Sequence, residues 1–237
     1  LPNIPWQPRP DTTGQRIKDL PLQLACAMLN QRLSRLTREA DCAFQGAAVS
    51  TEELFQTAEL FNMGVTADPE KWQPAMESAL LELRRACQFG FTPAELNEIA
   101  AQVRASYKKQ INSWATTNAA TMADSLVNCI SEQDTMTTPE EDLRVFELGL
   151  ARIKQAPELC RQALNEAFDS ARAKLMLTGA KAAGISGESL RSLYNKVMQQ
   201  EVSAPEVEEL PPFAYEQPGT PGSIEKQAII EDLGVTT

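Results

Sequence analysis

The side chains that most often carry out chemistry in enzymes are limited in this sequence, and one type is missing. The 237 residues include no histidine. A serine–histidine–aspartate triad, a cysteine–histidine pair, a histidine general base and every zinc site with a histidine ligand are therefore excluded for this chain on its own. Any nucleophilic, acid–base or metal chemistry would have to come from its cysteines and carboxylates.

The cysteines are spaced too widely for a metal or redox motif. Successive cysteines lie 16, 45, 42 and 31 positions apart, so no C-x-x-C pair exists, and the odd count argues against a disulfide framework. A catalytic cysteine would need a base beside it, and no imidazole is available. We predict free thiols that serve as small core residues at all five positions: Cys26, Cys42, Cys87, Cys129 and Cys160.

Charged side chains cluster at several places, and none has the spacing of a catalytic or metal site. Glu52–Glu53 and Glu140–Asp142 follow Ser or Thr at capping distance, so we expect them to stabilise helix N-termini. The glutamates between 206 and 209 and the basic pairs Arg84–Arg85 and Lys108–Lys109 are expected to be solvated. We therefore predict no catalytic, cofactor-binding or metal-binding residue, and no cofactor in this chain.

The charge and the hydropathy of the sequence limit the kinds of partner that the chain can bind. The chain has 22 basic and 32 acidic residues, a net charge of −10, which argues against nucleic acid because a cationic face is needed to displace counterions from phosphates. No run of 18 apolar residues is present, so we expect no membrane partner. The first residues lack an initiator Met and the apolar region of a signal peptide, which suggests a piece of a longer protein.

Helical periodicity dominates the middle of the sequence. A stripe of Leu and Cys predicts a helix over about 16–38, with Pro21 opening or breaking it. The stripes of Leu, Met and Trp in this and the later helices are interpreted as core. A second helix is expected to begin at Asp68-Pro69 and to stop by Gly90. Capping boxes at Thr92 and Thr138 predict the starts of two more, and a break at 116–118 separates the first of these from a further helix. The last two are expected to open at Pro157 and to span about 186–199.

Three segments have the pattern of strands. Apolar and polar residues alternate in 59–66 and in 172–179, as expected for half-buried strands, and 42–49 is a run of small residues. Helices bunched between strands predict an α+β fold with a small, mostly antiparallel sheet. Three strands make a thin sheet, so we expect the fold to be truncated at its N-terminal strand, with strands supplied by adjoining sequence.

Prolines concentrate at both ends. This pattern predicts an extended entry segment over 1–15, one α+β domain over 16–200 and an interdomain strap over 201–237. The strap carries large apolar residues that a disordered linker would normally lack, so we expect it to dock on the domain, with a short helix near 222–232 capped by Ser223.

Two long runs carry a resemblance to a known family. LQLACAMLNQRLSRLTREAD and AELFNMGVTADPEKWQPAMESALLELRRACQFGFTPAEL resemble the non-catalytic second domain of insulinase/pitrilysin zinc metallopeptidases. The most specific parts are an N-x-R-L helix end, here Asn30, Arg32 and Leu33, and GFTPAEL at Gly90–Leu96. KLMLTG at 174–179 and the exit segment are also similar, so the resemblance extends from about Pro5 to Thr237.

The resemblance implies an α/β-roll domain that forms one wall of a closed chamber. In that family, zinc is bound by an H-x-x-E-H helix in the first domain, so the zinc is expected in the parent's catalytic domain and this chain should be inactive alone. The implied partners are the catalytic domain and the C-terminal half of the same parent, together with a peptide substrate.

Two alternatives stay open from the sequence. One is a structural or assembly subunit of the same fold without peptidase activity, because fold does not establish function. The other is an acidic helical module that recruits basic partners. The resemblance also suggests a bacterial parent, periplasmic or cytoplasmic.

Overall fold

The structure is a computed structural model, and it describes residues 4–5, 9–54, 57–179, 182–205, 229–230 and 235–236. By internal contacts the chain forms two units, Leu1–Pro205 and Glu206–Thr237. The first unit holds all the helices that the structure describes. The second holds a small hairpin of β4 (Ile229–Ile230) and β5 (Val235–Thr236), which pair antiparallel.

The sheet of the first unit is small and antiparallel. Its strand order is β1–β3–β2, where β1 is Ile4–Pro5, β2 is Gly46–Leu54 and β3 is Ala58–Thr66. β2 and β3 pair along their whole lengths, whereas β1 pairs only with the first two residues of β3. The alternating pattern of 59–66 therefore marks a strand correctly, and the strand expected over 42–49 lies a few residues further on.

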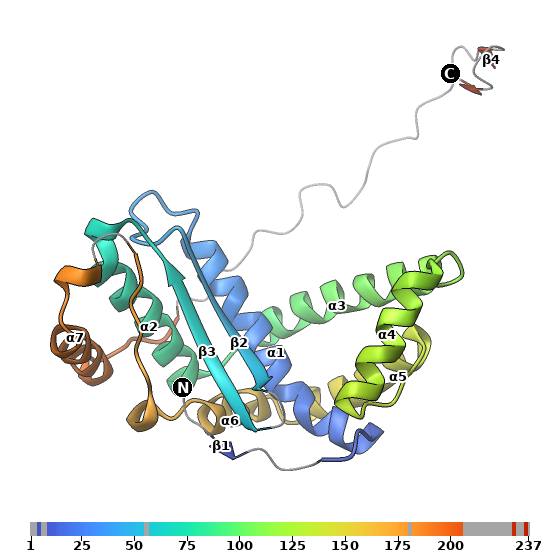
Figure 1. The fold of residues 1–237 in the computed structure, drawn as a ribbon, viewed down its shortest axis with the longest axis horizontal. Coiled ribbons are helices and arrows are strands. Elements are labelled where there is room, and N and C mark those ends of the chain that lie inside the picture. Colours follow the sequence, from blue (N-terminus) through green and yellow to red (C-terminus); the bar gives the residue numbers. More distant parts are fainter. Residues whose placement is uncertain are drawn as a thin grey trace. The chain divides into compact units, whose positions relative to one another are not determined.

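Helix α1 (Thr13–Leu36) packs against the sheet and forms the centre of the unit (Figure 1). The Thr12 hydroxyl caps its N-terminus by accepting from the Gln15 N–H at 3.1 Å. Asn30 fastens the helix to β2: its amide donates to the Val49 carbonyl at 2.9 Å and accepts from the Val49 N–H at 2.7 Å. Pro21 lies inside the helix and does not open or break it, so that expectation is wrong.

The remaining helices follow the order that periodicity predicts, and four of them begin at capping residues. The helix expected from Asp68-Pro69 begins instead at Trp72, after a 3-10 turn. Thr92 and Thr138 each form a complete capping box, with Glu95 and Glu141 three residues later. Asn118 and Ser186 cap two further helices. The helices are α2 (Trp72–Phe89), α3 (Pro93–Trp114), α4 (Ala119–Glu132), α5 (Pro139–Gln155), α6 (Glu158–Ala167) and α7 (Gly187–Gln199), with short 3-10 turns at Pro69–Lys71, Ser170–Arg172 and Ala182–Gly184.

The core lies where α1 meets α2, α5 and α6, and α7 adds to it by packing on α2. Each of these helices contributes side chains with 1% or less of their surface exposed, and burying a Leu, Ile or Met fully contributes about 1.5–3 kcal/mol. The largest are Met28, Leu29, Leu33, Leu83, Leu150, Ile153, Leu164 and Val197. This core holds the elements that carry the polar network and the surfaces described below.

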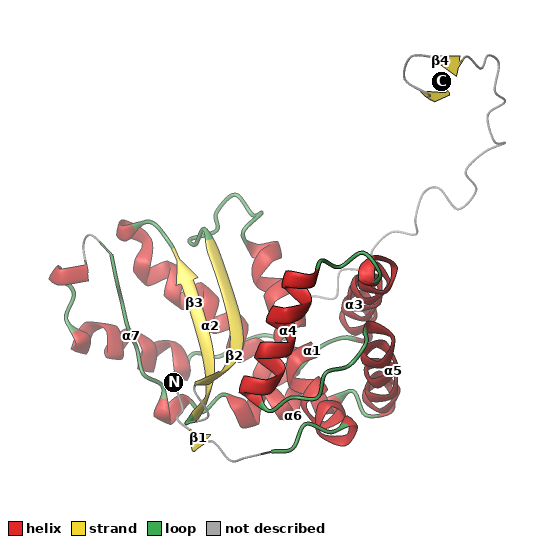
Figure 2. Ribbon diagram, turned by 45° about the vertical axis from the view of Figure 1, so that its right-hand side comes forward, coloured by secondary structure: helices red, strands yellow, loops and turns green. Residues whose placement is uncertain are grey.

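Three local expectations are wrong. The stretch 172–179 is not a strand: it follows a 3-10 turn and runs alongside β3 without pairing to it (Figure 2). Glu52 and Glu53 lie within β2 and do not cap a helix, because the strand pairing of their neighbours outweighs the local capping signal. Ile229–Ile230 form a strand and not part of a helix; the rest of 222–232, and the docking of the strap, lie outside the described residues.

Candidate functional site

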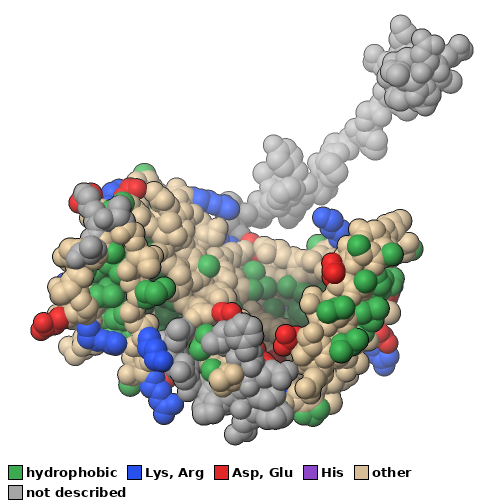
Figure 3. Space-filling view, viewed as in Figure 1, with side chains coloured by type: hydrophobic (Ala, Val, Ile, Leu, Met, Phe, Trp, Pro, Cys, Tyr) green, Lys and Arg blue, Asp and Glu red, His purple; other side chains and the backbone are tan. Residues whose placement is uncertain are grey.

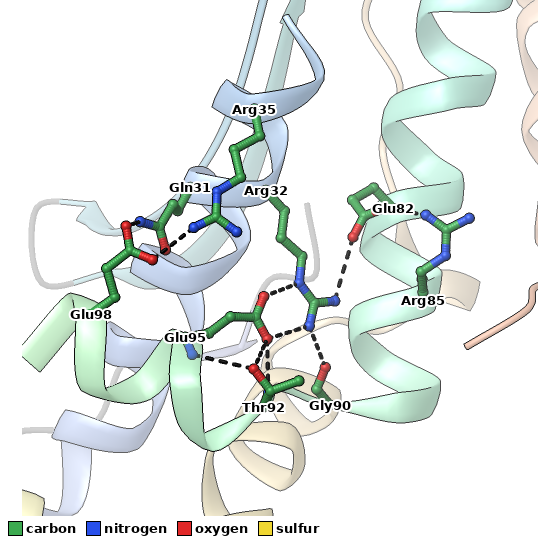
Figure 4. A network of polar contacts seen from close by, with 9 residues as sticks. All are labelled: Gln31, Arg32, Arg35, Glu82, Arg85, Gly90, Thr92, Glu95 and Glu98. Atoms are coloured by element: carbon green, nitrogen blue, oxygen red, sulfur yellow. Dashed lines mark hydrogen bonds and ion pairs between the residues drawn. The ribbon is translucent and has the colours of Figure 1, made fainter. Parts of the chain in front are cut away.

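Among the charged side chains whose burial is described, Glu82 and Arg32 are the two most buried. Both belong to one polar network, in which Arg32 extends from α1 (Figure 4). Its guanidinium donates to both carboxylate oxygens of Glu95, from Nε at 2.5 Å and from Nη2 at 2.8 Å. Nη2 also donates to the Gly90 carbonyl at 2.9 Å, and Nη1 lies 3.4 Å from Glu82 Oε1. Arg32 therefore joins α1 to the end of α2 and the start of α3.

The loop between α2 and α3 is shaped to receive this guanidinium. Gly90 has a φ of 72°, a left-handed conformation that glycine adopts most readily, and it turns its carbonyl toward Arg32. The ring of Phe91 lies under the guanidinium, with 4.9 Å from the ring centroid to Cζ. Glu95 also accepts from the Thr92 N–H at 2.8 Å, so one carboxylate both caps α3 and pairs with Arg32.

The two most specific motifs of the resemblance thus meet in space. Asn30, Arg32 and Leu33 of the N-x-R-L pattern fasten α1 to β2, to the α2–α3 loop and to the core. The loop is GFTPAEL, Gly90–Leu96. The sequence shows each motif alone; their pairing across about sixty positions is visible only in the structure.

The electrostatics of the network favour its charged form. Burial by itself disfavours the charge on Glu95, but the hydrogen bonds from Arg32 and Thr92 outweigh it and hold the pKa of the carboxyl below its usual value. For Arg32, burial likewise works against the charge, and Glu95 and Glu82 together raise the pKa. The pair is therefore ionised near neutral pH, and its contacts hold the three helices in position.

The neighbouring basic pair on α2 also has a structural role. Arg84 Nη1 donates to the Val197 carbonyl at 2.7 Å and to the Gln200 carbonyl, at the C-terminus of α7. Arg85 pairs with Glu82 and donates to the Ser203 carbonyl at 3.1 Å. The expectation that this pair is solvated is wrong, because both guanidiniums donate to backbone carbonyls in the last turn of α7 or after it. Lys108 and Lys109 are exposed as expected.

The described residues contain no group of three or more Cys, Asp or Glu side chains placed to hold a metal ion. All five cysteines are free thiols; Cys26 and Cys160 are buried, and the other three are half-buried. Burial raises the pKa of Cys26 and Cys160 to about 11. Thiols in this state are poor nucleophiles near neutral pH. No helix among the described residues is both long and apolar enough to cross a membrane.

Helix α4 presents an apolar face to solvent. None of its residues is buried, and Leu126, Val127 and Ile130 are 44%, 60% and 76% exposed. Hydrophobic side chains gather over α4 in the space-filling view (Figure 3). The interpretation of this stripe as core is therefore wrong for α4. We call these three side chains the α4 apolar face; exposed apolar surface of this kind is typical of protein–protein contact sites.

A second open surface is a groove beside the sheet. Its volume is about 560 Å³, and it is bounded by β3 on one side and by residues 173–179 on the other. Its base consists of apolar side chains of α2, namely Met76, Leu80 and Leu83. It contains no cluster of charged groups, so it is suited to an apolar peptide segment and not to an ionic ligand.

The comparisons with known proteins agree with this architecture. Residues 15–103 match a family model described as the Peptidase M16 inactive domain. The matched region contains α1, the sheet hairpin, α2 and the Arg32 network. No curated protein sequence gives a significant match.

Solved structures with the same fold are proteases. The periplasmic protease PqqL from Escherichia coli has a TM-score of 0.71 at 17% identity, over 96% of this chain and 25% of that one. A protein described as a predicted insulinase family protease from Yersinia pestis has a TM-score of 0.66 at 14% identity, over 83% and 42%. The ferredoxin protease FusC, solved with Arabidopsis ferredoxin, has a TM-score of 0.54 at 12% identity, over 83% and 22%.

Residues 15–103 are thus similar to the inactive domain of M16 peptidases, and the fold of the chain is similar to that of part of these insulinase-like proteases. The expected fold class, helix-rich α+β with a small antiparallel sheet, is confirmed. The chain spans about a quarter of the length of PqqL and about two fifths of the Yersinia pestis protein.

Proposed function

We propose that this chain is a non-catalytic, chamber-forming segment of a zinc-dependent endopeptidase, where it supports the catalytic domain and encloses a peptide substrate. The observation that carries the proposal is the α4 apolar face on a domain of the inactive M16 type. An isolated domain gains nothing from exposed Leu, Val and Ile side chains, whereas a domain that packs on a larger protein buries them.

The roles divide as follows. The Arg32 network fixes the mutual positions of α1, α2 and α3, and α4 contacts the catalytic domain or the C-terminal half of the same parent. Zinc belongs to the catalytic domain and would polarise the attacking water there. Peptide is the substrate, and neither nucleic acid nor membrane is a partner. A bacterial parent, periplasmic or cytoplasmic, fits the likeness to PqqL.

A complementation experiment tests this function. The chain alone should neither cleave a peptide library nor retain zinc after dialysis. Mixed with the rest of the parent protein, it should restore cleavage that a chelator abolishes. Chelator-sensitive cleavage by the chain alone would contradict the proposal, and so would a parent whose remainder is fully active without it.

Matched variants of α4 locate the contact. Replacing Leu126 and Ile130 together by Ser should weaken the restoring effect at least about tenfold, which corresponds to 1.4 kcal/mol. Asn128→Ala, on the opposite side of the same helix, should restore cleavage like the unmodified chain. If the remainder of the parent lacks the H-x-x-E-H motif and never cleaves, the chain belongs to a structural subunit instead.

A further inference from the structure

Among the described residues, the segment that contains α4 is tied to distant parts of the chain by hydrogen bonds on its C-terminal side only. No residue of α4 is buried, the helix makes no extensive contact with another described helix or strand, and Figure 2 shows it set apart from α3 and α5. On its N-terminal side the hydrogen bonds of residues 115–118 are local, as in the cap that Asn118 provides to the Thr121 N–H. The direction of α4 therefore depends on the turn that follows it.

The turn after α4 has a fixed geometry. Gln133 adopts a left-handed conformation with a φ of 61°, and its N–H donates to the Ile130 carbonyl at 3.4 Å. The Asp134 N–H donates to the Cys129 carbonyl at 2.8 Å. These two bonds form a Schellman motif, which ends the helix and sets the direction in which the chain leaves it. Because Thr135 follows directly, contacts that hold Thr135 also set the direction of α4.

Thr135 is bound by residues at the start of the domain. Its N–H donates to Asp11 Oδ2 at 2.8 Å, and its hydroxyl donates to the Asp11 carbonyl at 3.2 Å. Its carbonyl accepts from Arg16 Nη2 on α1 at 2.8 Å. All three polar groups of Thr135 therefore have partners that lie 119 and 124 positions earlier in the sequence.

Arg16 uses every donor of its guanidinium in this contact. Nε and Nη2 donate to the two carboxylate oxygens of Asp11 at 2.6 and 2.5 Å. Nη1 donates to the Thr137 hydroxyl at 2.9 Å and to Asp142 Oδ1, in the first turn of α5, at 2.8 Å. With the bond to Thr135, all five N–H groups have an acceptor, and the ammonium group of a lysine cannot reproduce this planar arrangement. We call Asp11, Arg16 and Thr135 the α4 clasp.

The two charges of the clasp stabilise each other. The hydrogen bond from Arg16 holds the pKa of the Asp11 carboxyl below its usual value, and Asp11 raises the pKa of Arg16. Both groups are therefore charged near neutral pH. The side chains of Asp11 and Arg16 are 12% and 29% exposed, so solvent screens the pair only in part.

We propose that the α4 clasp positions α4 for its contact with the rest of the parent protein, which makes Asp11 and Arg16 positioning residues for assembly. The proposal rests on the proposed function, because it needs α4 to make that contact. A helix without buried residues cannot fix its own orientation by packing, and a surface that is already held in its bound orientation loses less freedom on association. The clasp supplies this orientation by joining the end of α4 to α1, which belongs to the core.

Hydrogen exchange in the 237-residue chain tests the clasp by itself. In Asp11→Ala the Thr135 amide loses its acceptor, so it should exchange at least about tenfold faster than in the unmodified chain. The Asp134 amide, whose acceptor is the Cys129 carbonyl within α4, should keep its protection, because the helix stays formed while its attachment opens. Unchanged exchange of the Thr135 amide, or loss of protection at both amides, would overturn the proposal.

Assembly is measured by the concentration of the chain that restores half of the parent's cleavage. Asp11→Ala and Arg16→Lys should each raise this concentration at least about tenfold, because α4 must then be ordered on association. Arg35→Ala is the matched control: Arg35 lies on the same helix and pairs with Glu98, both are more than 40% exposed, and the concentration should stay unchanged. Normal restoration by Arg16→Lys would contradict the proposal, and this variant decides alone if Asp11→Ala fails to fold.

A combined variant distinguishes positioning from general stabilisation. In a chain that already carries Leu126→Ser and Ile130→Ser, the α4 apolar face is lost, so adding Arg16→Lys should weaken assembly by less than about twofold more. A further tenfold loss would mean that the clasp acts on the whole domain, and the proposal would be wrong. If the unmodified chain and all clasp variants restore cleavage equally, the clasp proposal fails and the proposed function stands. If the unmodified chain restores no cleavage, the proposed function fails, and the assembly role of the clasp fails with it.

Discussion

The junction of α1, α2 and α3 differs sharply from helix α4, although both are amphipathic in sequence. At the junction even charged groups are buried: Arg32 is 8% and Glu82 4% exposed, and each has partners. On α4 even large apolar groups are exposed, up to 76% for Ile130. The difference separates a part of the domain whose polar groups are paired within it from a part whose apolar groups are left exposed to solvent.

The largest effect is expected from breaking the junction. Arg32→Ala leaves the buried carboxylate of Glu95 without its cation and Glu82 with Arg85 alone, so the free energy of unfolding should fall by about 3–5 kcal/mol. Arg35→Ala removes a pair with Glu98 in which both side chains are more than 40% exposed, and should cost less than about 1 kcal/mol. Urea unfolding of the three proteins measures both. Equal losses would mean that burial does not distinguish the two pairs.

The junction should also make stability depend on pH. The folded-state pKa of Glu95 lies below its usual value of 4.5, so the unfolded chain binds the proton more readily. The contribution of Glu95 is therefore present above pH 4.5 and is lost as the pH falls through the folded-state pKa. Unfolding measured from pH 6 down to pH 3 should show this loss. Glu95→Gln should be less stable at pH 6 and should lose less on acidification; an unchanged slope would contradict the assignment.

Local sequence signals predict those parts of the fold that depend on interactions between neighbouring residues. Thr92 and Thr138 mark helix starts because a capping box involves only four neighbouring residues. Residues 172–179 do not form a strand, because a strand also needs a partner strand and an alternating pattern does not supply one. Glu52–Glu53 followed a capping-type residue, yet strand pairing prevailed.

The candidate sites are harder to predict from the sequence than the helix starts are. Arg32 lies in an apolar helical stripe, which hints at burial, but its partner Glu95 is 63 positions away. The α4 stripe reads as core because periodicity shows that a helix has an apolar face and not whether anything covers it. Both sites depend on contacts between distant parts of the chain.

The two capping boxes give a comparison of intermediate size. Thr138→Ala removes a cap at an exposed helix start and should cost about 1 kcal/mol. Thr92→Ala should cost more, toward about 2 kcal/mol, because Thr92 also holds the carboxylate that pairs with Arg32. Thermal unfolding of both variants tests the order. A larger loss at Thr138 would show that the Arg32 network adds nothing to the cap.

The smallest effect on stability is expected on the α4 apolar face, and a matched pair of isoleucines measures it. Ile153 on α5 is 1% exposed, so Ile153→Ala should lower the free energy of unfolding by about 2–5 kcal/mol through lost burial and a cavity. Ile130→Ala makes the same chemical change at a side chain that is 76% exposed, and the free energy should change by less than about 0.5 kcal/mol. Urea unfolding of the 237-residue chain gives both values.

A loss above 2 kcal/mol for Ile130→Ala would mean that α4 packs against its own domain, and the contact with the rest of the parent would then have to lie elsewhere. A negligible loss in the chain, combined with a large loss in the assembled parent, is the result expected of a surface that is buried only when its partner is present.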